Sequence, residues 1–259
     1  MTDPPRMRPR AVVFDLDGLM FNTEELYQLV GTEVLRRRGK TFDAELLDSM
    51  MGRPPRVALQ LMIDWHQLDA TIEELAAEND EVFAGLLDTR LAFMPGLAEL
   101  LEALEAAGIP KAIATSSGPK FVANVLGRFQ LAPRFEFILT CDDITDGKPH
   151  PEIYWTAAER FAIDPGEMLV LEDSQNGCRS AVAAGAFTVA VPAGQSRSHD
   201  FTGAKLVIDT LADPRLYSVL GIKGREVGLV GVSPLGGSAL PPEGGTPSYE
   251  TDSRPRRSS

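Results

Sequence analysis

A regular alternation of helical and strand-like segments limits the possible folds of this chain more than any other pattern in it. After Pro95-Gly96, segments with apolar residues at three- and four-residue spacing alternate with short apolar runs. This order is typical of an α/β domain built on a parallel sheet. An earlier run at 11–14 (AVVF) is wholly apolar, which predicts a strand buried on both faces of such a sheet. The later strand-like runs lie at 111–115, 135–140, 168–172, 187–191 and 205–209.

A purely helical stretch interrupts this alternation. Between residues 23 and 91 every periodic segment has helical spacing, and glycines and a Pro-Pro pair divide the stretch into about four helices. We therefore expect an α/β core, formed by residues 11–22 and 92–220, that carries a helical insertion at 23–91.

Both ends of the chain differ from this body in composition. Residues 1–10 contain three prolines and predict a short flexible arm. The 39 residues at 221–259 include eight glycines, five prolines and six serines. A segment of this composition buries too little apolar surface to offset the conformational entropy that it would lose on ordering. We expect a flexible tail there, in which 227–232 (VGLVGV) could add a short edge strand.

Charge and hydropathy exclude several classes of protein. The chain has 25 Lys and Arg against 37 Asp and Glu, a net charge of -12, which argues against general binding to nucleic acid. No run approaches the roughly 18 apolar residues that span a bilayer, and the N-terminus lacks a secretory signal. We expect a cytoplasmic protein that binds neither nucleic acid nor membrane and is a monomer or a small homo-oligomer.

Polar residues follow the predicted strands where ligands bind in parallel α/β sheets, beyond the carboxyl ends. Carboxylates that converge there would raise one another's pKa unless a cation neutralises them. Mg²⁺ fits best, because it prefers hard oxygen ligands and is often held by a few carboxylates and a substrate phosphate. The residues at these ends are Asp15, Asp17, Thr115, Ser116, Lys148, Glu172 and Asp173.

The spacing of these residues suggests separate roles. Asp15 directly follows a buried strand, so it would be held rigidly enough to act as a nucleophile, and Asp17, two residues on, could handle protons. Thr115 and Ser116 offer a hydroxyl and backbone amides to phosphate oxygens, and Lys148 offers a positive charge. Glu172 and Asp173 would complete the metal site.

Each of these features also has a structural explanation when it is taken alone. Asp-x-Asp-Gly often forms a turn, Thr-Ser-Ser often caps a helix, and a lysine before a proline is often a solvated loop residue. Their joint occurrence at successive strand ends, in the order carboxylates, hydroxyls, lysine, carboxylates, favours a catalytic site.

Four segments resemble the motifs of the haloacid dehalogenase-like hydrolases: FDLDGLMFNTEELY, ATSS, GKPHPEIY and LEDSQNGCRSAVAAG. They occur in the family's order, and a helical insertion lies between the first and second, as in the β-phosphoglucomutase-like subgroup. The resemblance covers roughly residues 11–210. It implies a Rossmann-like parallel sheet core with an inserted α-helical cap domain that closes over the site.

The resemblance also implies residue roles. Asp15 would form an aspartyl-phosphate, and Asp17 would protonate the leaving oxygen and then activate water. Mg²⁺ would be held by the Asp15 carboxylate, the Asp17 carbonyl and Asp173, with Glu172 as a direct or supporting ligand. Thr115 and the Ser116 amide would bind the phosphate, and Lys148 would stabilise its charge and orient Asp15.

Two departures from the mutases of this subgroup favour a phosphatase of a small phosphorylated metabolite. Those mutases tend to have a histidine where this chain has Tyr27, and a Lys-Asn pair where it has Gly118-Pro119. A β-phosphoglucomutase-like phosphosugar mutase stays the alternative. A non-enzymatic binding protein ranks lower, because both Asp15 and Asp17 are present.

The insertion should set the choice of substrate, since the core chemistry involves only the phosphoryl group. Arg53 or Arg56 lies at a helix connection that is expected to face the cleft and could contact substrate. A solvated arginine at a helix end explains either residue equally well.

Overall fold

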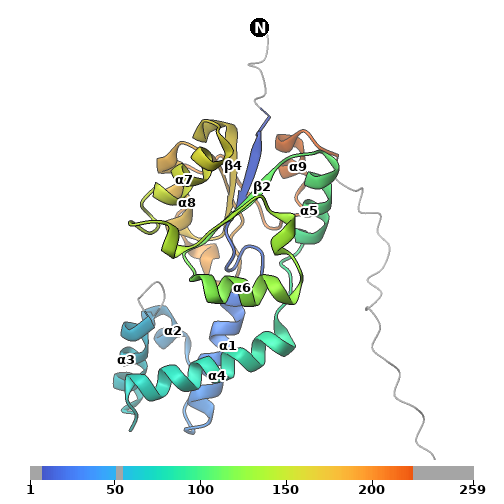
Figure 1. The fold of residues 1–259 in the computed structure, drawn as a ribbon. Coiled ribbons are helices and arrows are strands. Elements are labelled where there is room, and N and C mark those ends of the chain that lie inside the picture. Colours follow the sequence, from blue (N-terminus) through green and yellow to red (C-terminus); the bar gives the residue numbers. More distant parts are fainter. Residues whose placement is uncertain (1–7, 51–54, 224–259) are drawn as a thin grey trace, which may run out of the picture. The chain divides into compact units, whose positions relative to one another are not determined.

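The computed structural model describes residues 8–50 and 55–223. Its six strands form one parallel sheet in the order β3-β2-β1-β4-β5-β6. Helices lie on both sides of this sheet (Figure 1). The strands are β1 (Ala11–Phe14), β2 (Lys111–Ala114), β3 (Ile138–Leu139), β4 (Met168–Glu172), β5 (Phe187–Ala190) and β6 (Leu206–Val207). The expected α/β, Rossmann-like fold class is confirmed by this all-parallel sheet with helices between its strands.

Helices cover both faces of the sheet, and successive strand residues point to opposite faces. On β1, Val12 and Phe14 pack in one apolar cluster with helices α5, α6 and α9, whereas Val13 packs in another with α7 and α8. Both faces of the central strand are therefore buried, as its wholly apolar sequence predicts. These helices are α5 (Leu97–Ala106), α6 (Pro119–Arg128), α7 (Glu152–Phe161), α8 (Gln175–Ala184) and α9 (Pro214–Leu220).

Between β1 and α5 the described residues contain helices joined by loops, and these helices build a third apolar cluster of their own. Buried residues of four helices form that cluster, among them Val34, Leu46, Met62 and Leu75. The helices are α1 (Thr23–Arg36), α2 (Ala44–Met50), α3 (Pro55–His66) and α4 (Ile72–Arg90). We call α1 to α4 and their connections the insertion.

Local sequence signals explain where several of these helices begin and end. Thr71 and Glu74 form a capping box at the start of α4. Ser174 caps α8, and Gly185 ends that helix in a left-handed conformation with a φ of 87°. Four short 3-10 helices lie in the loops, at Ala132–Arg134, Cys141–Asp143, Pro165–Glu167 and Gly194–Ser198.

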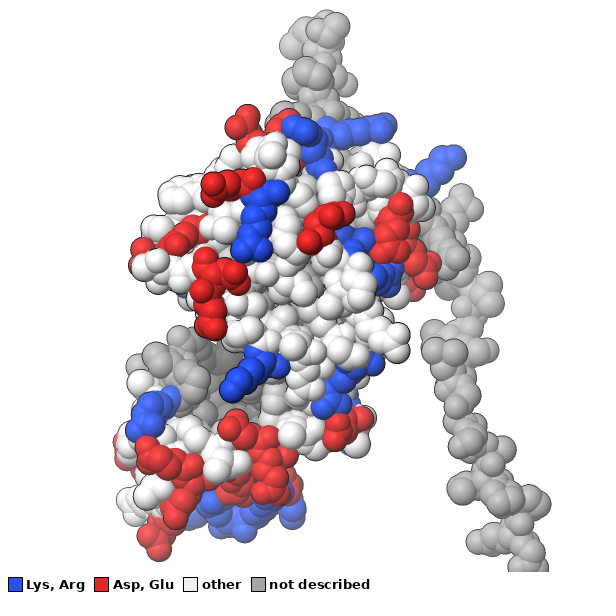
Figure 2. Space-filling model, viewed as in Figure 1, with Lys and Arg blue, Asp and Glu red and all other residues white. Residues whose placement is uncertain are grey.

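Charged side chains of both signs are scattered among uncharged residues on the face shown in Figure 2. On the insertion, Arg38 pairs with Glu78 at 2.6 Å and Arg37 pairs with Glu33 at 3.1 Å. Among the described residues, no helix combines the length and the apolar character needed to cross a membrane. The predicted tail at 221–259 lies outside the described residues from 224 on, as does most of the predicted arm.

Candidate active site

Three neighbouring strands bring the polar side chains of the site together. Asp15 follows β1, Thr115 follows β2, and Glu172 is the last residue of β4, while β1 lies between β2 and β4 in the sheet. The backbone N–H of Asp15 donates to the carbonyl of Leu171, and that of Thr115 donates to the carbonyl of Leu139, both at 3.0 Å. The sheet therefore holds both residues at their backbones.

Lys148 lies between two of the carboxylates. Its ammonium donates to Asp15 Oδ1 at 2.6 Å, to Glu172 Oε1 at 2.6 Å and to the carbonyl oxygen of Ala114 at 2.9 Å. These three bonds use all three donors of the ammonium, and only 5% of the side chain is exposed. Lys148 therefore fixes Asp15 and Glu172 relative to one another.

Glu172 is fully buried, and its two oxygens accept further hydrogen bonds. The Tyr154 hydroxyl donates to Oε1 at 2.6 Å, and the Ser174 hydroxyl donates to Oε2 at 3.2 Å. Tyr154 was not predicted from the sequence as part of the site. Its hydroxyl group lies on the buried side of α7, beside the apolar residues Ile153 and Ala157, and a polar group at such a position indicates a buried partner.

Asp17 reaches the site from the loop after β1. Its Oδ2 accepts hydrogen bonds from the Ser117 and Thr115 hydroxyls, the latter at 3.4 Å. Its Oδ1 is buried and has no hydrogen-bond partner among the described residues. One oxygen of Asp17 is thus anchored to the strand end of β2, whereas the other is buried without a hydrogen bond from a described residue.

These residues surround one cavity of about 520 Å³, which we call the phosphate pocket. Glu172 lies behind it and does not line it. The loop after β5 adds His199, which was not among the predicted site residues because its sequence position shows no partner for it. The predicted residues that line the pocket are Asp15, Asp17, Thr115, Ser116, Lys148 and Asp173.

Burial raises the pKa of the aspartates in this pocket. It raises the pKa of Asp15 to about 8, although the attraction of Lys148 lowers it. Burial also raises the pKa of Asp17, and burial followed by the charges of Asp15 and Glu172 holds the pKa of Asp173 well above its usual value. For Lys148, burial lowers the pKa, but the two neighbouring carboxylates outweigh it and the net shift is upward.

The carboxylates form an oxygen-rich group that suits a divalent cation. Oxygens of Asp15, Glu172 and Asp173 lie within 4.8 Å of one another, and all three residues are buried. Hard oxygen donors in such number fit Mg²⁺, whose charge would relieve the repulsion that raises their pKa values.

Two arginines of the insertion were considered as substrate contacts. Arg53 lies outside the described residues. Arg56, on α3, pairs with Glu73 at 2.8 Å, and 71% of its side chain is exposed. Arg56 is therefore a solvated arginine at a helix start.

Comparison with known proteins identifies the family. Residues 12–191 of this chain match the haloacid dehalogenase-like hydrolase family. A probable pseudouridine-5'-phosphatase of Drosophila melanogaster is 33% identical over 78% of this chain and 89% of its own length. A bifunctional riboflavin kinase/FMN phosphatase of Arabidopsis thaliana is 30% identical over 79% of this chain, which spans only 54% of that protein.

Solved structures show the same fold. CbbY from Rhodobacter sphaeroides, in complex with phosphate, is 27% identical, covers 82% of this chain and 99% of its own, and has a TM-score of 0.68. A β-phosphoglucomutase from Clostridium difficile, at 23% identity, covers 82% and 97% with a TM-score of 0.62 and supports the fold alone. With its match over residues 12–191, its parallel sheet and its helical insertion, the chain belongs to the haloacid dehalogenase-like hydrolases and is an enzyme.

Proposed function

We propose that this enzyme is a Mg²⁺-dependent phosphatase that hydrolyses a small phosphorylated metabolite through an aspartyl-phosphate. The observation that carries the proposal is the position of Asp15. Lys148 binds one of its oxygens at 2.6 Å, and Asp17 and Thr115 line the same pocket. A fixed carboxylate beside a second carboxyl group and a hydroxyl suits in-line attack on a phosphoryl group.

In the first step, an Asp15 oxygen forms a bond to phosphorus while the bond from phosphorus to the leaving oxygen breaks. Asp17 gives its proton to that oxygen, a role that the upward shift of its pKa by burial favours. Thr115 and Ser116 bind the phosphoryl oxygens, and Lys148 balances the charge that develops on them.

In the second step, water attacks the phosphorus of the aspartyl-phosphate. Asp17, now ionised, takes a proton from that water, and the bond between phosphorus and the Asp15 oxygen breaks. Inorganic phosphate leaves, and both aspartates return to their initial states. The free Oδ1 of Asp17 suits this exchange of protons.

Asp15, Asp173 and the Asp17 carbonyl would hold Mg²⁺, and Glu172 would support them. When bound, the ion supplies charge neutralisation for the phosphate in a pocket of carboxylates. Glu172 acts mainly by positioning, because Lys148, Tyr154 and Ser174 already occupy its oxygens.

The names of the two curated relatives, a probable pseudouridine-5'-phosphatase and an FMN phosphatase, support phosphate monoesters as the substrate class. We further propose that residues 23–91 act as a cap over a core formed by 11–22 and 92–220. The insertion supports this role, because Glu24 and Tyr27 on α1 line the phosphate pocket.

Release of inorganic phosphate tests the proposal. We expect turnover of at least one compound in a panel of sugar phosphates, nucleoside monophosphates and p-nitrophenyl phosphate, with Mg²⁺ and not with EDTA. Asp15→Asn should reduce turnover by at least about a thousandfold, since the nucleophile is lost. The exposed Asp69→Asn is the matched control and should keep full activity.

Absence of phosphate release from every compound would contradict the proposal. Interconversion of β-glucose 1-phosphate and glucose 6-phosphate that needs a trace of the bisphosphate would instead establish the mutase.

A further inference from the structure

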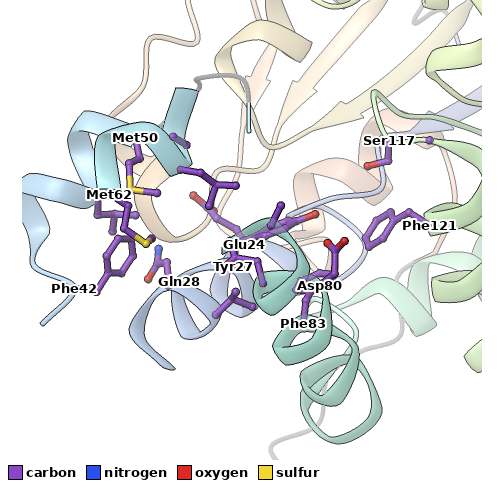
Figure 3. A pocket seen from close by; sticks show the side chains of 18 residues that line it. Glu24, Tyr27, Gln28, Phe42, Met50, Met62, Asp80, Phe83, Ser117 and Phe121 are labelled. Carbon is purple, nitrogen blue, oxygen red and sulfur yellow. The ribbon is translucent and has the colours of Figure 1, made fainter. Parts of the chain in front are cut away.

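A second cavity adjoins the phosphate pocket and has no assigned role in the chemistry above. It has a volume of about 660 Å³, within the range of small-molecule sites. Glu24 and Tyr27 line both cavities, and Ser117 lines the second one next to the strand end that carries Thr115 (Figure 3). We call this second cavity the leaving-group chamber, because a molecule whose phosphate lies in the pocket would extend into it.

Aromatic side chains from three helices lie along one side of the chamber. The rings of Tyr27 on α1 and Phe83 on α4 stack with centroids 4.6 Å apart at an angle of 12°. The ring centroids of Phe83 and of Phe121 on α6 are 5.9 Å apart. Although Phe83 covers part of its ring, 54% of Tyr27 remains exposed, so its ring surface is available at the junction of the two cavities. An exposed ring that borders a cavity offers a flat ligand a surface for stacking.

The charged residues among those described around the chamber are both acidic, Glu24 and Asp80. A second phosphate in the chamber would therefore meet two carboxylates and no described lysine or arginine, an arrangement that repels it. Uncharged or cationic groups face no such penalty.

The chamber also contains an unused hydrogen-bond acceptor. Asn79 Oδ1 is buried and has no hydrogen-bond partner among the described residues. A buried acceptor without a partner is costly, so a ligand that donates an N–H or O–H would satisfy it. Together with Glu24 and Asp80, it gives the chamber several hydrogen-bond acceptors, beside the amide group of Gln28.

We propose that the leaving-group chamber selects monophosphates whose organic part is a flat ring, uncharged or cationic, with N–H or O–H donors. The ring packs against Tyr27, its donors face Asn79 and the carboxylates, and a second phosphate is excluded. This inference rests on the proposed phosphatase function and names its substrate class.

Matched pairs of substrates test the proposal with the full chain. Uridine 5'-monophosphate and adenosine 5'-monophosphate add a flat ring to the scaffold of ribose 5-phosphate, and uridine 3',5'-bisphosphate adds a second phosphate to the first of them. We expect kcat/KM of the better nucleotide to exceed that of ribose 5-phosphate about tenfold, the size of one stacking contact. We expect the bisphosphate to be at least about tenfold poorer than uridine 5'-monophosphate.

Variants tie these ratios to the chamber. Tyr27→Ala should lower the ratio of nucleotide to ribose 5-phosphate about tenfold, and Tyr27→Phe should keep it, because the ring alone provides the stacking surface. Asp80→Asn should raise kcat/KM for the bisphosphate relative to the monophosphate about threefold. Trp65 on α3 is an exposed aromatic (45%, against 54% for Tyr27) that does not line the chamber, so Trp65→Ala should leave every ratio unchanged.

The outcomes separate the two proposals. No hydrolysis of any compound, ribose 5-phosphate included, would overturn the phosphatase itself. Hydrolysis in which ribose 5-phosphate matches both nucleotides, the bisphosphate matches the monophosphate, or Tyr27→Ala changes no ratio would overturn the chamber's selectivity and leave the phosphatase standing.

Discussion

At the scale of single residues, the site depends on one buried ammonium and the groups that keep it in place. Lys148 touches both Asp15 and Glu172, and Glu172 is held in turn by Tyr154 and Ser174. Because removing one partner of a buried ion pair leaves an uncompensated charge, Lys148 and its two carboxylates depend on one another. Tyr154 binds Glu172, so we expect it to be a positioning residue that acts on Asp15 through Glu172 and Lys148.

We predict that Tyr154→Phe lowers kcat about tenfold with little change in KM, because the hydroxyl orients the carboxylate and does not reach the pocket. The loss of one hydrogen bond to a charged group should lower the free energy of unfolding by about 2 kcal/mol. Steady-state kinetics and urea unfolding measure the two effects. Trp155→Phe, an exposed neighbour on α7, is the control, and equal kinetics for both variants would remove Tyr154 from the network.

The predicted site residues were accessible from the sequence because they follow strand ends, and parallel strands end at the same edge of the sheet. Tyr154 was not accessible in this way, because it reaches the site from the side of a helix. Ser117 follows the same strand end as Thr115, but its hydrogen bond to Asp17 was not predicted. Contacts of this kind depend on how α7 and β2 pack, which spacing alone does not encode. The catalytic roles themselves stay predictions.

At the scale of elements, helix α8 packs directly against the carboxylate of Glu172. Gly177 lies in its first turn, and a methyl group on its Cα would overlap the carboxylate of Glu172, which three hydrogen-bond donors hold in place. Glycine is usually unfavourable inside a helix. Its presence here is explained by the close approach of α8 to Glu172.

We predict that Gly177→Ala destabilises the protein by about 1–2 kcal/mol and lowers kcat about tenfold, since Glu172 and Lys148 must shift. Gly127→Ala in α6 is the matched control, because nothing lies within 4 Å of a methyl group there. That variant should be about 0.5–1 kcal/mol more stable than the natural chain and fully active. The unfolding temperatures of the two variants test this prediction. Equal stabilisation by both substitutions would show that Glu172 is not held in a fixed position.

The sequence predicts the central elements well and the edges poorly. Its central strands at 11–14 and 168–172 are confirmed, and the structure gives them the same bounds. The run at 135–140 yields only Ile138–Leu139, and the run at 205–209 only Leu206–Val207, because each pairs with a strand on one side alone. Helix α9 was not predicted, although Asp213 and Pro214 form a recognisable start for it.

At the scale of the whole described chain, three apolar clusters stabilise the fold. The site between their strands instead has an excess of negative charge. Among the described residues, Asp15, Glu172 and Asp173 are buried and Asp17 is half-buried, and the ammonium of Lys148 binds only Asp15 and Glu172 of these four. Their repulsion opposes folding in the absence of a cation, so stability and metal binding should be coupled.

We predict that Mg²⁺ at a hundred times its Kd stabilises the protein by about 2.7 kcal/mol and raises its unfolding temperature. Asp173→Asn should unfold at a higher temperature than the natural chain without Mg²⁺, because a repelling carboxylate is gone, and should lose the response to Mg²⁺. Differential scanning calorimetry with and without the ion measures both. A full Mg²⁺ response in the variant would place the metal elsewhere, and the exposed Asp142→Asn serves as the control.

The central claim, that Asp15 is the nucleophile and Asp17 its proton partner, is tested most directly by trapping the intermediate. In Asp17→Asn, p-nitrophenyl phosphate can still phosphorylate Asp15, because its leaving group needs little protonation, whereas water lacks its base. We predict that acid-quenched Asp17→Asn carries one phosphoryl group on the peptide that contains Asp15, detected by mass spectrometry, and that Asp15→Asn carries none. Rapid turnover by Asp17→Asn with no phosphorylated peptide, or a phosphoryl group on another residue, would contradict the account.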